Sequence, residues 1–405
     1  MLSQTVTVVG IGADGWAGLS PRSKAALEQA GVLVGGPRQL ALLPEAVPGR
    51  RIPLPSPLLP GLSELVAAHA GSALVVLASG DPMFYGIGST LVAILGATHV
   101  RVLPHLSSVS LAAARLGWPL DEVTVVSLVG RPRELLHPVL QPGRRVFALT
   151  AETTAAARIR ALLDDRGFGG SPVTVLADLG GEQEAVGPAD GQPHSRLAII
   201  AIECRLDGGA TPLSCVPGLP DNAFEQDGQI TKREIRALAL AALAPVPGQL
   251  LWDVGAGSGS IGIEWMRVHP ASRTIAVEPR ADRRERISRN AAALGVPGLV
   301  VVAGKAPDAL SGLPRPDAVF VGGGVTDDGV LRACWDALAE GGRLVAHAVT
   351  IEGQAVLTDW WHGTGGTLTR LGVERADRLG TFTTWRPALP VVQWSAQKAQ
   401  SKEHP

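Results

Sequence analysis

The chain has 405 residues and a formal net charge of −1, and nearly all of its basic charge is arginine. This length allows two or three domains, and the balanced charge argues against a nucleic-acid-binding protein, which normally carries a basic surplus. The three cysteines lack metal or redox spacing, and no apolar run reaches membrane-spanning length. We therefore expect a cytoplasmic protein without a metal site, a nucleic-acid partner or a membrane segment.

The N-terminal half alternates strand-like and helix-like segments, which indicates an α/β architecture. The expected strands are residues 5–9, 73–78, 99–103, 123–128, 145–149, 173–176 and 196–202. The first strand runs into GIGADG, Gly10 to Gly15, which has the dinucleotide spacing G-x-G-x-x-G. A helix is predicted only later, with Ser20 as its cap and Pro21 as its first residue. A dinucleotide pyrophosphate would therefore lack a helix terminus at these glycines.

Two later strand ends carry further candidate ligand-binding residues. In ASGDPMFYGIG, Gly80 permits close backbone approach and Asp81 sets a turn before the next helix. Ser107 and Ser108 stand at a strand-to-helix junction in PHLSSVSLAAARLG. Serines at such junctions are commonly N-caps, so this interpretation stays open beside a cofactor contact.

Taken in order, GIGADG, SGDPMFYG, the two serines, SLVGR (127–131) and FALT (147–150) resemble the class III, tetrapyrrole-type S-adenosylmethionine (SAM) methyltransferases, and within them the CbiE type. The resemblance covers residues 5–203. It implies a domain over residues 1–205, made of two α/β lobes that meet near residues 104–107. It further implies that SAM is held by Gly10, Gly12, Gly80, Asp81, Tyr85, Ser107, Ser108, Leu128 and Thr150.

A stretch rich in Gly and Pro, residues 206–219, separates the two halves and is predicted to be a linker, with a second domain over 220–405. Beyond it, Thr231 and Glu234 have capping-box spacing at the start of an amphipathic helix that Pro245 ends. The preceding polar segment, FEQDGQ, is suited to close over a cofactor. A capped helix with a solvated approach explains the pattern equally well, and the site candidates here are Phe224, Gln229, Thr231 and Lys232.

The clearest cofactor signal is LLWDVGAGSGSIG, residues 250–262, which predicts a strand, a glycine turn and a helix. Gly257, Gly259 and Gly262 also satisfy the dinucleotide spacing, so a nicotinamide-dependent oxidoreductase is the alternative. Asp253 favours SAM, because its strand-end carboxylate can accept hydrogen bonds from a cationic, amino-acid-like group. The sequence resembles motif I of the class I SAM methyltransferases. Glu278 ends the next strand and could bind ribose hydroxyls of either cofactor.

The remaining segments follow the order of a doubly wound sheet, with GKAPDAL, FVGGG and LVAHAVTIE at successive strand ends and a reversed final hairpin over residues 367–394. Together with motif I they resemble CbiT. The resemblance implies that His347 joins the catalytic candidates Phe224, Gln229 and Lys232, although His347 and Lys305 depart from the expected residue types. It also implies that a second SAM is bound by Thr231, Asp253, Gly255, Ala256, Gly257, Ser258, Gly259, Glu278, Gly304, Ala306, Gly322 and Gly323.

The whole chain thus resembles the fused precorrin C(5,15)-methyltransferases (decarboxylating), the CobL type. This family implies methylation of precorrin-6B at carbons 5 and 15 with loss of the ring C acetate carboxylate, two SAM sites per chain, and homo-oligomers, either dimers or tetramers. Substrate carboxylates call for guanidinium partners. The candidates by position are Arg131, Arg133, Arg233 and Arg236.

Overall fold

A computed structural model describes residues 5–400, and the chain divides into two compact units. The first unit comprises Met1–Arg131 and Pro142–Thr211, and the second comprises Pro132–Gln141 and Pro212–Pro405. The short segment Pro132–Gln141 therefore packs with the C-terminal part of the chain, which the sequence pattern did not indicate.

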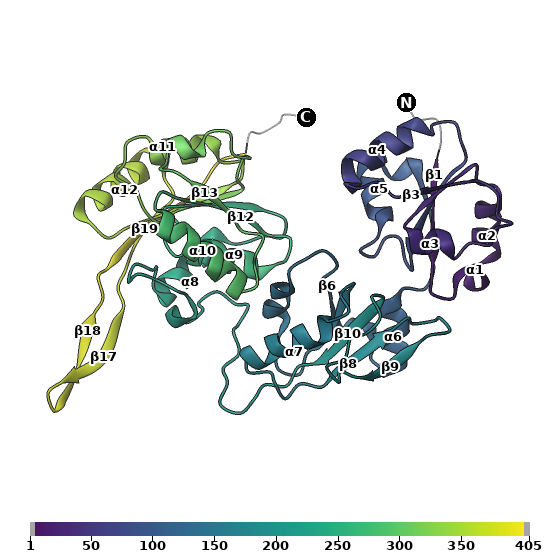
Figure 1. The fold of residues 1–405 in the computed structure, drawn as a ribbon. Coiled ribbons are helices and arrows are strands. Elements are labelled where there is room, and N and C mark those ends of the chain that lie inside the picture. The colour runs from purple at the N-terminus through teal and green to yellow at the C-terminus, as the bar shows by residue number, and fades with distance from the viewer. Residues whose placement is uncertain (1–4, 401–405) are drawn as a thin grey trace. The chain divides into compact units, whose positions relative to one another are not determined.

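The first lobe of the first unit is a parallel five-stranded sheet with strand order β3-β2-β4-β1-β5 (Figure 1). Its strands are β1 (Val6–Ile11), β2 (Val32–Gly35), β3 (Arg50–Pro53), β4 (Leu74–Ser79) and β5 (Val100–Leu103). Its helices are α1 (Gly15–Gly18), α2 (Pro21–Glu28), α3 (Pro37–Ala41), α4 (Leu58–Ala68), α5 (Ile87–Leu95) and the 3-10 turn η1 (Ala97–His99). The sheet is parallel and covered by helices, so its central strands β1 and β4 are almost entirely buried.

The turn after β1 is partly as expected. The Ser20 side chain accepts a hydrogen bond from the Ser23 backbone N–H, with Pro21 at the first position of α2, as the sequence predicts. However, the four-residue helix α1 begins at Gly15, so a single helical turn follows the glycines directly. Strands β2 and β3 are only four residues long and were not predicted from the sequence.

The second lobe contains a mixed sheet with strand order β6-β7-β10-β8-β9, in which only β6 and β7 are parallel. Its strands are β6 (Val123–Ser127), β7 (Arg145–Thr150), β8 (Val173–Ala177), β9 (Ala185–Pro188) and β10 (Ala198–Glu203). Its helices are α6 (Ser108–Leu116), η2 (Leu120–Glu122) and α7 (Ala155–Asp165). Helix α6 contributes Val109, Ala112 and Ala113 to the core of this lobe.

The second unit is built on a seven-stranded sheet with strand order β13-β12-β11-β14-β15-β19-β16 (Figure 1). Its strands are β11 (Leu250–Val254), β12 (Arg273–Glu278), β13 (Val300–Ala303), β14 (Ala318–Val321), β15 (Arg343–Ala348), β16 (Thr367–Leu371) and β19 (Val391–Gln397). Its helices are α8 (Arg233–Leu243), α9 (Ser260–Val268), α10 (Ala281–Ala293), α11 (Val330–Ala337), α12 (Ile351–Thr364), η3 (Arg133–Val139), η4 (Asp221–Ala223) and η5 (Asp308–Leu310). Strand order reverses between β11 and β14, and such switch points are where open α/β sheets bind ligands.

The C-terminal end of the chain differs from the single hairpin that the sequence predicts. Strand β19 pairs antiparallel with both β15 and β16 inside the main sheet. Between β16 and β19, β17 (Glu374–Leu379) and β18 (Phe382–Pro387) form a separate two-stranded hairpin, drawn as the long yellow ribbon in Figure 1. Eleven of its twelve strand residues are exposed, so local alternation gave no sign of which face packs.

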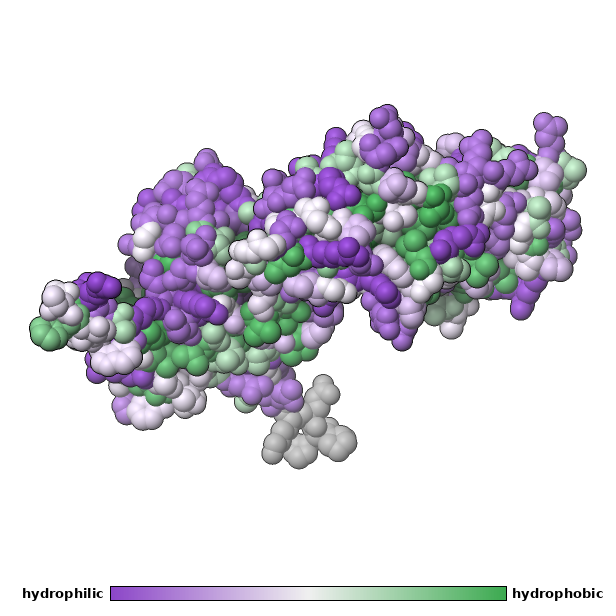
Figure 2. Space-filling view, turned by 90° about the horizontal axis from the view of Figure 1, so that it is seen from below, coloured by the Kyte–Doolittle hydropathy of each residue, from purple (hydrophilic) through white to green (hydrophobic). Residues whose placement is uncertain are grey.

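The surface is mainly hydrophilic on the face seen in Figure 2, with hydrophobic residues gathered in smaller groups. Among residues 5–400, no helix is both long enough and apolar enough to cross a membrane.

Candidate active site

Two glycine turns meet at the switch point of the C-terminal sheet. Gly255 follows β11 with φ of +68°, in the left-handed region that favours glycine. A Cβ on Gly255 would lie 2.8 Å from the Cα of Gly323, in the turn that follows the neighbouring strand β14. Side chains are therefore excluded where the two turns touch, and bare backbone faces the space above them.

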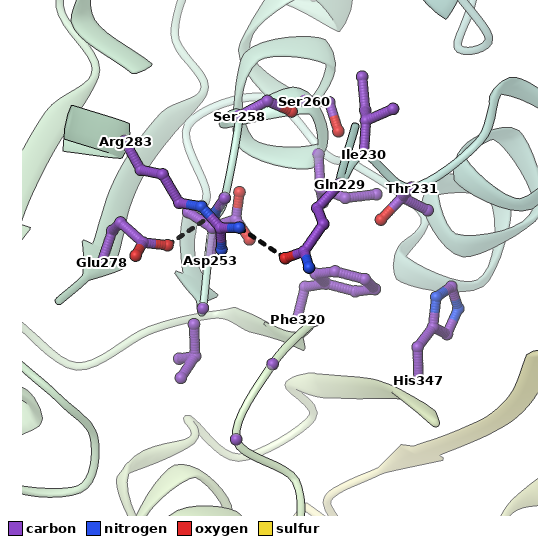
Figure 3. Close-up of a pocket in the computed structure, with 18 of the residues that line it drawn as sticks. Gln229, Ile230, Thr231, Asp253, Ser258, Ser260, Glu278, Arg283, Phe320 and His347 are labelled. Atoms are coloured by element: carbon purple, nitrogen blue, oxygen red, sulfur yellow. Dashed lines mark hydrogen bonds between the residues drawn. The ribbon is translucent and has the colours of Figure 1, made fainter. Parts of the chain in front are cut away.

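That space is a cavity of about 630 Å³ at the carboxyl ends of β11, β12, β14 and β15, which we call the C-terminal cavity (Figure 3). The structure brings most of the predicted C-terminal site residues to its wall. These are Gln229, Thr231, Lys232, Asp253, Gly255, Ala256, Gly257, Ser258, Glu278, Gly304, Ala306, Gly322, Gly323 and His347. Gly259 instead caps α9, where a Cβ would lie 2.9 Å from Ile287.

Two buried carboxylates lie at the glycine-turn end of the cavity. Asp253 accepts a hydrogen bond from the Gly262 N–H at 3.0 Å, and Glu278 accepts from Gly257 at 2.9 Å and from Arg280 at 3.1 Å. Burial raises the pKa of Asp253 to about 7, and the negative charge of Glu278 adds to this. Asp253 is thus a carboxylate whose charged form costs free energy and is favoured by a cationic ligand.

Asp253→Asn is expected to stabilise the second unit at pH 8, raising Tm by roughly 5 °C. The native pKa is about 7 and the ordinary value is 3.8. Between these values the native state binds more protons than the unfolded state, so the stability contribution of Asp253 is lost as pH rises from about 4 to 7. Asparagine removes the buried charge and keeps an acceptor for Gly262.

Thermal unfolding of the wild type and Asp253→Asn at pH 8 and pH 5 measures this difference, which should shrink at the lower pH. Asp359→Asn, on an exposed position of α12, is the matched control and should change Tm at neither pH. A destabilised Asp253→Asn at pH 8 would contradict a raised pKa.

The segment before α8 closes one side of the cavity. Arg283 of α10 donates to the Gln229 side-chain oxygen at 2.5 Å (dashed in Figure 3) and to Asp227 at 2.9 Å. The hydrogen bond from Arg283 to Asp227 is the largest cause that lowers the pKa of Asp227 to about 2. The predicted closing segment is therefore fixed to α10 by charge-assisted hydrogen bonds.

The same segment departs from the sequence prediction at Phe224. This proposed catalytic residue is 4% exposed, does not line the C-terminal cavity, and packs in the core beneath the segment. The Arg236 guanidinium lies 4.8 Å from the centre of its ring. Aromaticity next to acidic residues suggested a site contact, but here it reflects burial against a cation.

Arg236 is likewise buried rather than available to a substrate. It is fully buried and donates to Glu264 at 2.6 Å and to Asp221 at 3.2 Å. It also donates to the carbonyl oxygens of Leu219 and Thr231. No sequence pattern predicted these contacts, which position the segment that carries the cavity residues. Because its donors are used in them, Arg236 is removed from the substrate-binding candidates.

The predicted capping box at the start of α8 does not form. Lys232 occupies the N-cap position, and no side chain caps the helix. Glu234 instead pairs with Arg375, at 2.5 Å, and the Thr231 carbonyl accepts from Arg236. Tertiary partners therefore replace the local hydrogen bonds that the spacing predicted.

His347 and Lys305, the two departures from the family pattern, both line the cavity. The Nε2 atom of His347 lies 2.9 Å from the Gln393 side-chain oxygen, and its ring meets Phe320 edge-on at 5.0 Å. Burial lowers the pKa of His347 to about 4, so the imidazole is neutral at physiological pH. Lys305 pairs with Asp327 at 3.0 Å.

In the first unit, the predicted glycines lie where three strand ends approach closely. A Cβ on Gly10 would fall 2.0 Å from the Gly80 carbonyl oxygen and 2.7 Å from the His105 nitrogen, and one on Gly12 would meet the His105 ring at 2.8 Å. A Cβ on Gly80 would fall 3.1 Å from the Ser107 Cα. The structure therefore brings these residues together at one edge of the first lobe.

The serine pair also serves the local structure. Ser107 accepts from the Ser110 N–H as the N-cap of α6, and Ser108 is the first residue of the helix. The Asp81 side chain accepts from the Met83 N–H at 2.9 Å. The N-cap interpretation of Ser107 is thus confirmed, and a cofactor contact remains a prediction.

The other predicted residues of this unit lie on or beside the second lobe. The exposed Tyr85, with φ of +52°, donates from its hydroxyl to the Val125 carbonyl at 3.3 Å. Leu128 and Thr150 are buried at the ends of the parallel strands β6 and β7. Tyr85 thus connects the two groups of predicted contacts. Within residues 5–400, no cluster of three or more His, Cys, Asp or Glu side chains could hold a metal ion.

Comparisons with known proteins cover both units. Residues 5–191 match the model of the tetrapyrrole (corrin/porphyrin) methylases, and residues 222–398 match the precorrin methyltransferase domain. A precorrin-6Y C(5,15)-methyltransferase [decarboxylating] from Sinorhizobium sp. is 49% identical over 98% of this chain and 97% of its own. The Mycobacterium tuberculosis H37Rv protein of the same name is 45% identical over 97% of this chain and 100% of its own.

The C-terminal domain of precorrin-6Y C5,15-methyltransferase from Rhodobacter capsulatus, known from a crystal structure, is 47% identical in sequence to the matching part of this chain. The match covers 46% of this chain and 100% of that domain, with a TM-score of 0.44. The nicotinamide-dependent alternative receives no support from these relatives. The chain belongs to the precorrin-6Y C(5,15)-methyltransferase (decarboxylating) family.

Proposed function

We propose that this protein methylates precorrin-6B at carbons 5 and 15 and removes the carboxylate of the ring C acetate, giving precorrin-8 in cobalamin biosynthesis. The C-terminal half carries out the carbon 15 methylation and the decarboxylation, and the N-terminal half methylates carbon 5. The observation that carries the proposal is the C-terminal cavity, which places Asp253 and Glu278 beside two bare glycine turns, in a chain whose relatives bear this activity in their names.

The family implies SAM as methyl donor, and the residues of the C-terminal cavity fit it. Glu278 can accept hydrogen bonds from the ribose hydroxyls, and Asp253 can receive the cationic amino-acid end. The Ser258 hydroxyl lines the cavity and is buried without a hydrogen-bond partner in the described part of the chain, so it offers an open donor. A buried hydroxyl of this kind gains free energy when a ligand supplies its partner.

When bound, SAM supplies a methyl group on a sulfonium with a good leaving group, so the transfer needs no strong protein base. What the protein contributes is placement in a space shielded from water, an effect worth roughly 7 to 11 kcal/mol in oriented reactions. Phe320 and the neutral His347, held by Gln393, form part of the wall that shields the reacting carbon. When the bond to the acetate carboxylate breaks and carbon dioxide leaves, the electron pair of that bond stays on the substrate. It enters the electron-poor conjugated system that methylation at carbon 15 creates, and solvent supplies the proton.

We further infer that the N-terminal unit holds a second SAM, giving two sites per chain. Support comes from the close approach of Gly10, Gly80 and Ser107, which leaves the backbone bare at the strand ends of the first lobe. The match of residues 5–191 to the tetrapyrrole methylases supports the same role. Titration calorimetry with SAM tests the count: two equivalents bound per chain are expected, and one equivalent would refute this part.

Incubation of the purified protein with SAM and precorrin-6B tests the activity itself. Mass spectrometry should show two methyl additions and one loss of carbon dioxide, with all three dependent on SAM. A product that carries methyl groups without loss of carbon dioxide would leave the decarboxylase role unsupported.

We also propose a cytoplasmic homo-oligomer that binds a tetrapyrrole substrate and neither nucleic acid nor a membrane. The family resemblance suggests dimers through the first unit or tetramers through the second. Light scattering on the purified protein measures the state, and a monomer at micromolar concentration would contradict the proposal.

A further inference from the structure

One wall of the C-terminal cavity comes from the base of the β17–β18 hairpin and the residues that flank it. The residues that the hairpin and its flanks contribute are apolar except for Arg375, namely Val373, Ala388, Leu389 and Val391. Ile235 of α8 and Val349, which follows β15, add further apolar surface. An apolar shelf with one guanidinium suits a flat hydrophobic ring that carries carboxylates at its rim.

Arg375 is held at this wall by a partner from another element. Its Nη2 donates to the Glu234 carboxylate of α8 at 2.5 Å, and this pair joins residues 141 positions apart. Both side chains are about half exposed, and ion pairs this exposed to solvent contribute little to stability. Nη2 is the one atom of Arg375 that the described structure places in a hydrogen bond, so the guanidinium keeps donors for a second carboxylate.

The hairpin offers a second arginine that makes the contrast clear. Arg386 stands directly opposite Arg375 in the strand register, so the two side chains share one face of the hairpin. Arg386 pairs with Asp377 of the same hairpin at 3.1 Å and does not line the cavity. Arg386 thus has its acidic partner within the hairpin, whereas Glu234, the acidic partner of Arg375, lies on α8.

The other cations that line the cavity each have an acidic partner outside the hairpin, and Lys232 lies 3.9 Å from Asp221. Arg283 binds Asp227 and Gln229, and Arg280 binds Asp282 through two hydrogen bonds. Lys305 pairs with Asp327. Arg375 is therefore the cation that the described hairpin presents to the cavity.

We propose that Arg375 binds a peripheral carboxylate of the tetrapyrrole and so determines its position in the C-terminal site, with Glu234 holding the guanidinium in place before the substrate arrives. This inference rests on the proposed function, because it assigns the hairpin side of the cavity to the substrate. The arriving carboxylate takes the open donors of Arg375, and the apolar shelf covers the ring beside it.

Steady-state kinetics of carbon dioxide release from precorrin-6B tests the role of Arg375. Arg375→Gln should raise KM for precorrin-6B roughly tenfold, the size of one lost hydrogen bond to a charged group. The kcat should stay within about twofold, and SAM binding by calorimetry should be unchanged. Arg386→Gln is the matched control and should leave KM unchanged, because its charge is balanced within the hairpin.

An exchange of the two charges separates substrate binding from support of the hairpin. The double variant Glu234→Arg with Arg375→Glu keeps an ion pair at this position but puts a carboxylate on the hairpin wall. KM should stay raised if Arg375 binds substrate, and a return to the wild-type KM would show that the pair only holds the hairpin. If Arg375→Gln has the activity and the KM of the wild type, this inference is wrong but the proposed function stands. If the wild-type protein releases no carbon dioxide, the proposed function itself is wrong.

Discussion

Gly10→Ala is expected to lower the rate of methylation at carbon 5 by roughly 100-fold or more. The rate of carbon dioxide release should stay within about twofold of the wild type. The reason is steric. The added Cβ would stand 2.0 Å from the Gly80 carbonyl oxygen and 2.7 Å from the His105 nitrogen, both of which are backbone atoms. These strand ends must move apart, which displaces the turns that carry the predicted SAM contacts, and a displacement of about 1 Å can cost that much in rate.

Gly31→Ala is the control for this variant, because a Cβ on Gly31 meets nothing closer than 3.8 Å and its backbone is outside the left-handed region. Hydrogen exchange over β1 and β4 should show that the lobe still folds in Gly10→Ala. Normal carbon 5 methylation by this variant would remove the N-terminal turn from the site.

The reciprocal change, Asp253→Asn, should lower the rates of carbon 15 methylation and carbon dioxide release by roughly 100-fold. The rate of carbon 5 methylation should stay unchanged. Asparagine keeps the acceptor for Gly262 but loses the buried charge that, in our proposal, receives the cationic end of SAM. Because the substitution is expected to stabilise the fold at pH 8, lost activity cannot be ascribed to unfolding. Calorimetry should show one SAM per chain instead of two.

Asp253 should also make SAM affinity depend on pH. The carboxyl has a pKa of about 7 and binds a cation only when it is ionised, so affinity at the C-terminal site should fall as pH drops below about 7. In Asp253→Asn the one SAM that still binds should show no such dependence. An affinity in the wild type that is constant from pH 6 to 8 would argue that Asp253 does not face the cation.

A mixture of the two variants tests whether the sites act independently. If Gly10→Ala supplies carbon 15 methylation and Asp253→Asn supplies carbon 5 methylation, the mixture should form precorrin-8 that neither variant forms alone. Failure of the mixture, with each variant active at its own carbon, would mean that the intermediate passes only within one chain.

The sequence alone determined the α/β class and the positions of most buried strands, because alternating apolar runs and turn residues depend on local conformation. It also located the glycine turn after β11. Gly255 and Gly257 adopt left-handed backbone angles, which few other residues tolerate, so the pattern is visible without a structure. The same local patterns of apolar runs and turn residues also placed Asp253 and Glu278 at strand ends.

Tertiary packing alone decided which polar and aromatic residues are available to a ligand. Phe224 and Arg236 looked like site residues because they lie near the cofactor turn in sequence, but both are buried against each other. No sequence pattern marked Arg375 as a site residue, because it lies on an exposed hairpin and its partner Glu234 is 141 residues away. Burial and pairing of charges depend on which distant segments meet, and no local pattern along the chain carries that information.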